Sequence, residues 1–407
     1  MVDFSAFKGW RPPADSASEV ASVPYDVLST QEARSIIESN SKSMMRVIRP
    51  DGEMPEGSSL YSDDAYAQAL DSFSDLIARG LLVQDETPHY YVYAQQMGDH
   101  RQVGLMGLGS IEDYDNDRIK KHEYTRPDKE EDRVRHIDAV GAHLGPVFLS
   151  YRGKSRIDAL VSSVIIQRPD VEFTADDGVE HVLWAVSSAE LVNEIQMAFG
   201  EVDAFYIADG HHRAAAAARL GNSKDASDPR SSFLVVAFPD HALKILSYNR
   251  VVHHLNGHSV EEIMNKLEGR FDIEPLSGPE EPTSPKRFSM YIDGQWYALS
   301  FKSTVDTFAD DAVLSLDVSL LQNYVLAPIF GVEDPRTDTG IEFVGGIRGL
   351  STLAQRADKH QSVAFSMYPT SMQELLNVAD SGTVMPPKST WFEPKLRTGM
   401  VVNRFRD

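Results

Sequence analysis

Residues 205–218 constrain the fold more than any other stretch of the chain. An apolar run is followed by five polar or small residues, which are Asp209, Gly210, His211, His212 and Arg213. Five alanines come next. Alanine is the strongest helix former, and glycine is favoured where a tight turn needs a positive φ. The stretch therefore predicts a buried strand, a tight turn and a helix, with the polar cluster where the helix begins.

The start of such a helix is a natural site for an anion, because its N–H groups lack partners and its dipole is positive there. Arg213 can hold two phosphate oxygens at once, and Gly210 lets a ligand approach the backbone closely. His211 and His212 can donate hydrogen bonds, bind a metal or move a proton, and Asp209 could hold a metal ion or orient a histidine. The alternative is an ordinary helix cap in solvent. Five polar residues at one helix start favour a binding site.

A second segment is dense in charge and poor in residues that could pack a core. It begins Lys-Lys-His-Glu-Tyr-Thr-Arg at residues 120–126 and continues to Arg133. Glu123 is a candidate general base or metal ligand, and Lys121, Lys129 and Arg133 could neutralise phosphate charge. A solvated helix stabilised by charge pairs four residues apart has the same composition, and both interpretations stay open.

A third segment, residues 385–395, combines three prolines with two lysines, two hydroxyl groups and two aromatic rings. The prolines hold the backbone extended. A loop that folds over a ligand and a proline-rich tail packed on the body share this composition, and both stay open. In the first case we expect Lys388, Ser389 and Thr390 to contact phosphate.

Several classes of protein are excluded or disfavoured by what the sequence lacks. There is no cysteine, which excludes disulfides, thiolate nucleophiles and sulfur-based zinc sites. No Walker-type phosphate loop, Rossmann fingerprint, Gly-x-Ser-x-Gly elbow or His-Glu-x-x-His motif occurs. A net charge of −22 and the lack of a basic recognition helix disfavour nucleic acid. No apolar run is long enough to span a membrane and no signal peptide is visible, so we expect a cytoplasmic protein.

Periodicity and turn residues predict an α+β fold with several short sheets rather than one doubly wound sheet. The clearest elements are a capped helix after Ser29, a helix over 62–80, a strand pair over 89–95 and 102–111, and a hairpin over 287–301. Residues 276–286 have the composition of a linker. We therefore expect a core over 1–275, which carries the first two clusters, and a C-terminal α+β region over 276–407 with the proline-rich loop.

Five short motifs, in order along the chain, resemble the landmarks of the domain-of-unknown-function family 1015, whose members are often labelled ParB-like. The resemblance extends from about residue 3 to residue 404. The motifs are Val-Pro-Tyr-Asp at 23–26, Lys-His-Glu-Tyr-Thr at 121–125 with Lys129 and Asp132-Arg133, Ala-Asp-Gly-His-His-Arg at 208–213, Tyr-Asn-Arg at 248–250 and Met-Pro-Pro-Lys-Ser-Thr at 385–390. The resemblance implies a core similar to the ParB and sulfiredoxin superfamily, which includes nucleotide-dependent kinases of free serine.

By this resemblance, the backbone and side chains of Gly210, His211, His212 and Arg213 would hold a nucleotide phosphate from ATP or ADP. Glu123 would take the proton from a substrate hydroxyl group, and Asp209 would position Mg²⁺ or that hydroxyl. Lys121, His122 and Arg133 would steady the transferring phosphoryl group, because phosphoryl transfer depends on positioning and on charge neutralisation.

The leading hypothesis is a nucleotide-dependent phosphotransferase that acts on a small hydroxylated metabolite, with free L-serine as the first candidate. One alternative is a ParB-like nucleotide-binding switch without a metabolite acceptor. The other is a metal-dependent hydrolase built on His122, Glu123, His211 and His212. The expected partners are a nucleotide and a small-molecule substrate, and a homodimer stays open.

Overall fold

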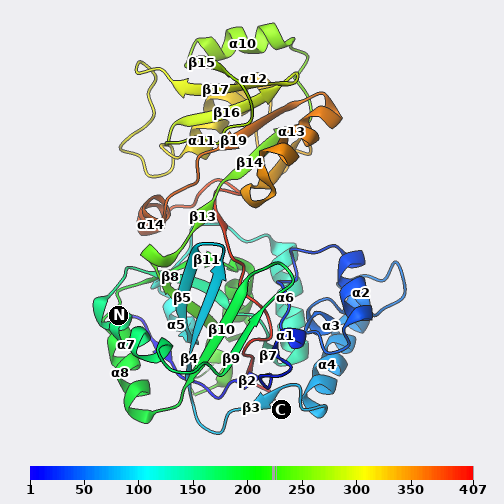
Figure 1. Ribbon diagram of the computed structural model, residues 1–407, viewed down its shortest axis with the longest axis vertical. Helices are drawn as coiled ribbons and strands as arrows, with labels where there is room; N and C mark the ends of the chain where they lie inside the picture. Colours follow the sequence, from blue (N-terminus) through cyan, green and yellow to red (C-terminus); the bar gives the residue numbers. More distant parts are fainter. Residues whose placement is uncertain (222–224, 226, 407) are drawn as a thin grey trace. The chain divides into compact units, whose positions relative to one another are not determined.

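The computed structural model describes residues 1–221, 225 and 227–406, which form two compact units. The first unit contains Met1–Leu243 together with Pro394–Asp407, and the second contains Lys244–Glu393. In Figure 1 the first unit is coloured blue to green with a red C-terminal segment, and the second is coloured green to orange-red. The two units are described separately below.

A large mixed sheet forms the centre of the first unit. Among the described residues it has nine strands, eight of them in the order β6-β11-β8-β12-β5-β4-β10-β9, with β1 paired to β5. The β6–β11 and β8–β12 pairs are parallel and the other pairs are antiparallel. The strands are β1 (Phe4–Ser5), β4 (Tyr90–Met97), β5 (His100–Ser110), β6 (Ile119–Lys120), β8 (Val147–Tyr151), β9 (Val171–Thr174), β10 (Glu180–Val186), β11 (Phe205–Asp209) and β12 (Ser232–Pro239).

Helices cover this sheet. Figure 1 shows α7 and α8 on the left of the unit and α2, α3, α4 and α6 on the right. Helices α7 and α8 pack on each other, whereas α9 packs against β8, β12 and α6, and α6 packs in turn on α4. The helices are α1 (Ala17–Val20), α2 (Thr30–Ser39), α3 (Met45–Ile48), α4 (Asp63–Ala78), α5 (Ile111–Asp115), α6 (Pro127–Val140), α7 (Ser155–Ile165), α8 (Ala189–Phe199) and α9 (His211–Gly221).

The predicted local elements of this unit are confirmed where the sequence signal was strong. Ser29 and Glu32 form a reciprocal capping box at the start of α2, and Ser62 caps α4. The predicted strand pair over 89–95 and 102–111 is β4–β5, and its turn contains Gly98 at positive φ. Each of these elements is specified by residues that are neighbours in the sequence.

The alanine run of α9 is buried as well as helical. All five alanines from Ala214 to Ala218 are buried, because α9 lies between the sheet and α6. Small side chains let a helix approach a sheet and a second helix closely. The run therefore fixes how near the polar start of α9 lies to the strand ends.

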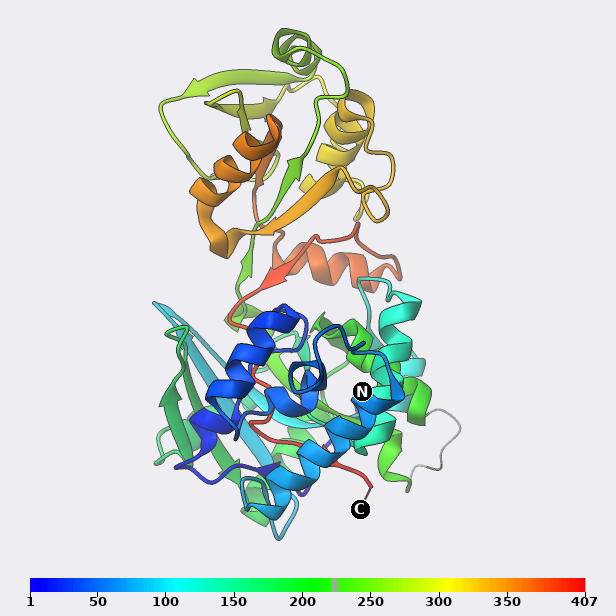
Figure 2. The ribbon, with the colours of Figure 1, turned by 90° about the vertical axis from the view of Figure 1, so that its right-hand side faces the viewer.

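The C-terminal segment of the chain returns to the first unit. The Thr398 N–H donates to the Ser22 carbonyl oxygen at 2.8 Å, and the Trp10 N–H donates to the Val402 carbonyl oxygen at 2.9 Å. Strand β21 (Asn403–Arg404) pairs with β7 (Ala142–His143), and β2 (Trp10–Arg11) pairs with β3 (Val83–Gln84). Figure 2 shows this red segment passing among the elements of the first unit.

The second unit is built on an antiparallel sheet, six-stranded within the described residues, in the order β15-β17-β16-β19-β14-β18. Its strands are β14 (Tyr248–Val252), β15 (Phe271–Leu276), β16 (Arg287–Ile292), β17 (Gln295–Phe301), β18 (Ile341–Gly345) and β19 (Val363–Met367). A small pair joins β13 (Ile245–Leu246) and β20 (Trp391–Phe392). Its α-helices are α10 (Val260–Glu268), α11 (Asp317–Leu321), α12 (Ala327–Phe330), α13 (Gly349–His360) and α14 (Met372–Asp380), and a π-helical turn (Gln322–Leu326) joins α11 to α12.

The predicted α+β class is confirmed, but the main sheet of the first unit is larger than the short sheets we expected. The predicted hairpin over 287–301 is present, with Asp293 and Gly294 both at positive φ in its turn. The compact units divide the chain at 243/244 rather than at the expected 275/276. Leu276 ends β15, and residues 277–286 connect β15 to β16 within the second unit. A linker was expected there because a long loop has the same composition.

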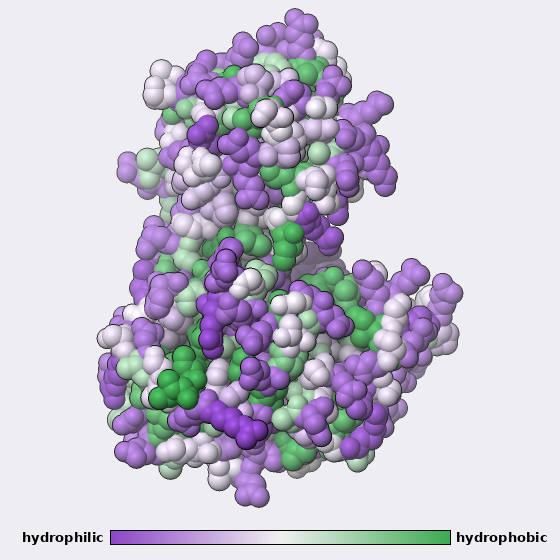
Figure 3. All heavy atoms as spheres, in the orientation of Figure 1, coloured by the Kyte–Doolittle hydropathy of each residue, from purple (hydrophilic) through white to green (hydrophobic). Residues whose placement is uncertain are grey.

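The surface in Figure 3 is largely hydrophilic over both units, with apolar side chains scattered among polar ones. Among the described residues, no helix has the length and hydropathy that a membrane span requires.

Candidate functional site

Two polar segments far apart in the sequence meet because two neighbouring strands are parallel. Strand β6 ends at Lys120 and β11 ends at Asp209, and the two strands pair with Phe205 opposite Ile119. The carboxyl ends of parallel neighbours lie at the same edge of a sheet. Lys121, His122 and Glu123 follow β6 directly, so they emerge beside the turn that follows β11.

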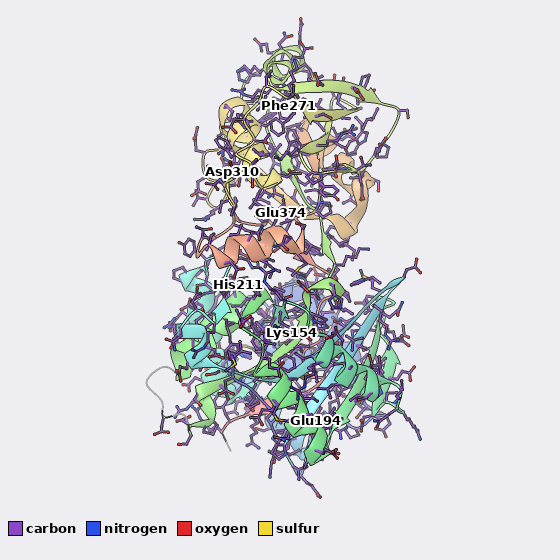
Figure 4. The ribbon with its side chains drawn as sticks, turned by 90° about the vertical axis from the view of Figure 1, so that its left-hand side faces the viewer. Lys154, Glu194, His211, Phe271, Asp310 and Glu374 are labelled. Carbon is purple, nitrogen blue, oxygen red and sulfur yellow. The ribbon has the colours of Figure 1, made fainter. Side chains whose placement is uncertain are left out.

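The turn after β11 requires a glycine. The register with β8 shifts between Ile207 and Asp209, and such a bulge redirects the side chains that follow it. Gly210 has a φ of +94°, and a Cβ atom there would lie 2.9 Å from Nε and Nη2 of Arg213. The positive φ disfavours any side chain at this position, and a Cβ atom would also push the guanidinium group of Arg213 aside. Helix α9 begins at the next residue, His211, which Figure 4 labels.

His122 and His211 are packed against each other at this edge. Their ring centroids are 4.6 Å apart with the ring planes nearly perpendicular, and both side chains are buried. Burial lowers the pKa of His122 to about 4, although the backbone hydrogen bond to Ile207 and the charge of Asp209 act against it. Burial, followed by the neighbouring His122, lowers the pKa of His211 well below its usual value. Both imidazoles are therefore neutral at pH 7.

Glu123 completes this cluster. One ligand atom from each of His122, Glu123 and His211 lies within 4.8 Å of the other two. Glu123 is half-buried, whereas the two histidines are buried. The cluster thus places one accessible carboxylate beside two neutral imidazoles at the helix start, an arrangement that can accept a proton or bind a cation.

Asp209 is held by two cations. Its Oδ2 accepts from Nη2 of Arg213 at 3.0 Å, and its Oδ1 accepts from Nζ of Lys395 at 3.2 Å. Burial alone would raise the pKa of Asp209, but the charges of Lys395 and Arg213 outweigh it and hold that pKa far below its usual value. Arg213 also donates to the carbonyl oxygen of Pro146, the residue before β8, and this contact helps to fix the guanidinium. Asp209 is therefore ionised and serves as the centre of an ion-pair network.

Lys395 reaches Asp209 because two buried glutamines hold the backbone of the C-terminal segment. Nε2 of Gln95, on β4, donates to the Lys395 carbonyl oxygen at 2.9 Å. Nε2 of Gln102, on β5, donates to Oε1 of Gln95 at 2.9 Å. An amide network of this kind is satisfied only when the segment is in place, so the sheet positions the lysine.

Direct binding of Mg²⁺ by Asp209 does not fit this arrangement. Mg²⁺ needs oxygen ligands in octahedral geometry, and each oxygen of Asp209 already accepts from a cationic group. A metal ion there would have to displace Arg213 or Lys395. No step proposed below passes through a metal ion on Asp209.

A pocket lies on the other side of Arg213. It encloses about 550 Å³ of empty space, open solvent included, and its lining includes Pro24, Tyr25, Arg133, Gly145, Arg213 and Thr398. The Arg133 guanidinium lies 3.9 Å from the centre of the Tyr25 ring and is bound by Asp132 at 2.5 Å. Burial raises the pKa of Tyr25 to about 12 although Arg133 acts against it. Parts of the first three motifs thus line one pocket.

The charged segment after β6 is partly a helix and partly not. Residues 121–126 form no helix or strand, and α6 begins at Pro127. The solvated-helix interpretation is wrong for its later part, since Asp132, Arg133 and His136 are buried. Lys121 lies over the Tyr114 ring with Nζ 4.1 Å from its centre. Burial, His122 and His212 lower the pKa of His211 more than the charge of Lys121 does.

His212 lies at the edge of the same site. Its Nε2 accepts from the backbone N–H of Arg126 at 3.0 Å. This contact ties the first turn of α9 to the segment that carries Glu123. The alternative of an ordinary helix cap in solvent is wrong for His211, because His211 is buried. His212 is half-buried.

The remaining predicted residues belong to the second unit. The Lys388 carbonyl oxygen accepts from Nη2 of Arg250 at 3.0 Å, and Lys388 Nζ lies 5.5 Å from the centre of the Tyr248 ring. The Ser389 hydroxyl donates to the Pro386 carbonyl oxygen at 2.7 Å. This part of the segment packs on the body of its own unit, and a role for Lys388, Ser389 and Thr390 at phosphate stays a prediction.

Tyr25, Lys395 and Gln95 contribute to the site but are not predicted from the sequence. Tyr25 belongs to the first motif and Lys395 ends the third segment, but neither pattern indicates a role for these two residues. Gln95 carried no signal at all, because nothing in a strand-like sequence shows that an amide will hold a segment 300 residues away.

Fold and site together define a mixed α+β protein with an ion-paired strand–turn–helix site. A family model described as "Protein of unknown function (DUF1015)" matches residues 4–319, so the chain belongs to that family. A search of curated proteins found no match.

Several solved structures are similar to parts of the chain. One is a free serine kinase in complex with AMP, at 14% identity over 72% of this chain and 91% of that one, with a TM-score of 0.35. A conserved hypothetical protein from Pyrococcus furiosus is 14% identical over 73% and 94%, with a TM-score of 0.34. C-terminally truncated SbnI from Staphylococcus aureus is 13% identical over 72% and 87%, with a TM-score of 0.38. TM-scores this low carry no argument about function.

Replacing Gly210 by alanine is expected to destabilise the first unit. A non-glycine residue in a sparsely populated conformation costs about 1–3 kcal/mol, and here the added Cβ would also press on Arg213. Gly80→Ala is the matched control, because Gly80 has a φ of +68° and no atom within 4 Å of the added Cβ. Urea unfolding should show a larger loss for Gly210→Ala than for Gly80→Ala. Equal losses would mean that the position of the Arg213 guanidinium does not depend on the absence of a side chain at Gly210.

Proposed function

We propose that the chain is a nucleotide-dependent phosphotransferase that acts on a small hydroxylated metabolite, with free L-serine as the first candidate substrate. The observation that carries the proposal is the convergence of two strand ends, which brings Glu123 and His122 to the N-terminus of α9 beside Gly210 and His211. A proton acceptor and an anion site then lie within one hydrogen-bonding region.

In this proposal the phosphate group lies at the first turn of α9. The N–H groups there and the positive end of the helix dipole favour an anion, and Gly210 adds no side chain of its own to the turn. The guanidinium group of Arg213 lies over the turn, oriented by Asp209 and Pro146. His212 adds a side chain at the rim of the same turn.

Glu123 is proposed as the general base because it is the accessible carboxylate of the cluster. The substrate oxygen attacks the terminal phosphorus of ATP or ADP, and the bond from that phosphorus to the leaving ADP or AMP breaks. The hydroxyl proton passes to Glu123. The lowered pKa values of His122 and His211 make their neutral imidazoles weak bases. They can therefore orient the carboxylate or the phosphoryl oxygens through hydrogen bonds without taking the substrate proton themselves.

The surrounding charges suit a reaction that moves negative charge. Asp209 is neutralised by Arg213 and Lys395, so the helix start is not repelled by a bare carboxylate. Lys121 supplies a further positive charge near His211. We also propose that the nucleotide contacts Arg133, Lys388, Ser389 and Thr390. Mg²⁺ is proposed to accompany the phosphates of the nucleotide.

The experiment is an assay of the purified full chain with ATP or ADP, Mg²⁺ and L-serine, with O-phosphoserine measured by mass spectrometry and ³¹P NMR. Formation of phosphoserine together with ADP or AMP is the expected result. If serine fails, a panel of small hydroxy metabolites with several phosphoryl donors follows. No phosphorylated product across that panel overturns the proposal, and tight nucleotide binding without an acceptor would favour a nucleotide-binding switch.

A further inference from the structure

The cluster of His122, Glu123 and His211 offers the set of ligands that a transition-metal ion takes in proteins. Two imidazole nitrogens and one carboxylate oxygen lie within 4.8 Å of one another. Three protein ligands and an open position are typical of a catalytic-type zinc site. In a tetrahedral site, ligand atoms about 2.0–2.2 Å from the ion lie about 3.3–3.6 Å apart, so the three side chains would have to draw together by about 1 Å to bind one ion.

The surroundings of the two histidines suit metal binding. A metal ligand must be a neutral imidazole, and both rings are buried, which disfavours the charged form. One ring nitrogen of His122 is engaged by the backbone of Ile207. A backbone hydrogen bond at the far nitrogen is the usual way in which a ligating histidine is oriented.

His211 gives a second, independent observation. Its side chain is only 7% exposed, and its Nε2 makes no hydrogen bond with any residue that the structure describes. A buried polar atom without a partner costs about 1–3 kcal/mol. Such an atom, next to another imidazole and a carboxylate, indicates a position that a ligand completes.

We propose that His122, Glu123 and His211 bind one divalent transition-metal ion, for which Zn²⁺ is the probe, and that this ion inhibits phosphoryl transfer. The two imidazoles and the carboxylate select against Mg²⁺, which prefers oxygen ligands. The second half of the proposal rests on the proposed function. A metal bound to Glu123 holds the lone pair that would otherwise accept the substrate proton, so the loaded protein has no general base.

The first experiment measures metal binding alone, without nucleotide or substrate. The full chain, treated with a chelator and dialysed, is titrated with Zn²⁺ by calorimetry, and Co²⁺ is added separately to record its visible ligand-field absorption. We expect one ion per chain and a tetrahedral or five-coordinate Co²⁺ spectrum that Zn²⁺ abolishes. The unfolding midpoint should also rise with Zn²⁺ concentration, since the ion binds the folded state.

Variants identify the ligands. His122→Gln, His211→Gln and Glu123→Gln should each weaken Zn²⁺ binding by more than the roughly 10–100-fold that loss of a second-shell partner costs. His241→Gln is the matched control, because His241 is a largely exposed histidine of the same unit. Where a buried-histidine variant does not fold, Glu123→Gln and the Co²⁺ spectrum of the unaltered protein decide. No Zn²⁺ binding, or binding that these three substitutions leave unchanged, overturns the proposal.

The second experiment adds Zn²⁺ to the transfer assay at increasing ratios to protein. Inhibition that is complete at one equivalent and reversed by a chelator is expected. A protein that binds Zn²⁺ at the three residues and keeps full transfer activity contradicts the inhibitory role and leaves the phosphotransferase intact. A protein that binds Zn²⁺ there but phosphorylates nothing under chelation contradicts the phosphotransferase and leaves the metal site intact, so the two failures are distinguishable.

Discussion

Glu123→Gln is expected to lower the turnover number of phosphoryl transfer by about 10²–10⁴-fold, the usual contribution of a general base. Glutamine has the shape of glutamate but cannot accept the substrate proton. Nucleotide affinity should stay the same, because the phosphate contacts proposed at α9 do not involve this side chain. Steady-state kinetics and nucleotide titration by calorimetry, on the same preparation, measure the two quantities.

Glu131→Gln is the control for that variant. Glu131 is an exposed glutamate on α6, paired with Arg219 at 2.7 Å, and it lies outside the proposed site. Its substitution should leave turnover unchanged. Parallel losses of turnover and nucleotide affinity in Glu123→Gln would show that Glu123 is part of the binding surface, and the assignment as base would be wrong.

The first unit is expected to lose stability steeply as the pH falls from about 6.5 to about 4. Five buried histidines have lowered pKa values, in each case chiefly through burial. The pKa is about 4 for His122, His136 and His143 and about 3 for His181, and that of His211 lies well below its usual value.

The sign follows from proton binding in the two states. An unfolded chain binds protons at histidine near pH 6.5, whereas the folded unit binds them only near pH 4 or below. Between these values the unfolded state holds more protons, so stability falls as the pH falls. A histidine pKa lowered from 6.5 to about 4 or about 3 corresponds to about 3–5 kcal/mol in full, and several such histidines together are comparable with the roughly 5–15 kcal/mol of a whole domain.

Chemical unfolding at a series of pH values, followed by hydrogen exchange in each unit separately, measures this effect. His143→Gln provides the matched variant, because burial is the sole cause of the low pKa of His143. The stability of that variant should fall less steeply with pH, because its unfolding takes up about one proton fewer. A stability profile that is flat from pH 7 to pH 4.5 would contradict the burial of these rings.

The strand, turn and helix over 205–221 could be predicted because their signals are local. An apolar run, a glycine and an alanine run are each read within a few residues of one another. The meeting of Glu123 with His211 could be proposed only from family resemblance, because it depends on the parallel pairing of β6 with β11, and no local pattern specifies which strands become neighbours. The motif at 385–390 was recognised equally well, but recognition of a motif gives no position in space.

The division into units shows the same limit. Pro-Gly-Ser composition at 276–286 correctly indicated irregular backbone, but it does not distinguish a loop between two strands of one sheet from a linker. The contacts that hold residues 394–406 on the first unit include backbone hydrogen bonds, the short pairing of β21 with β7, the ion pair of Arg397 with Asp177 and the amide of Gln95, and none of these has a sequence signature. The sequence therefore could not predict that Lys395 is an ion-pair partner of Asp209.

The pairing of Asp209 with Lys395 also determines when the site can form during synthesis. Ribosomes add residues at about 5–20 per second and domains fold as units as they emerge. The strand, turn and helix around Asp209 leave the ribosome early, but Lys395 follows only after the whole second unit has been made. Until then Asp209 can form its ion pair with Arg213 but not the one with Lys395. A nascent or prematurely terminated chain thus carries an incomplete site, and the last segment acts as the final step of its assembly.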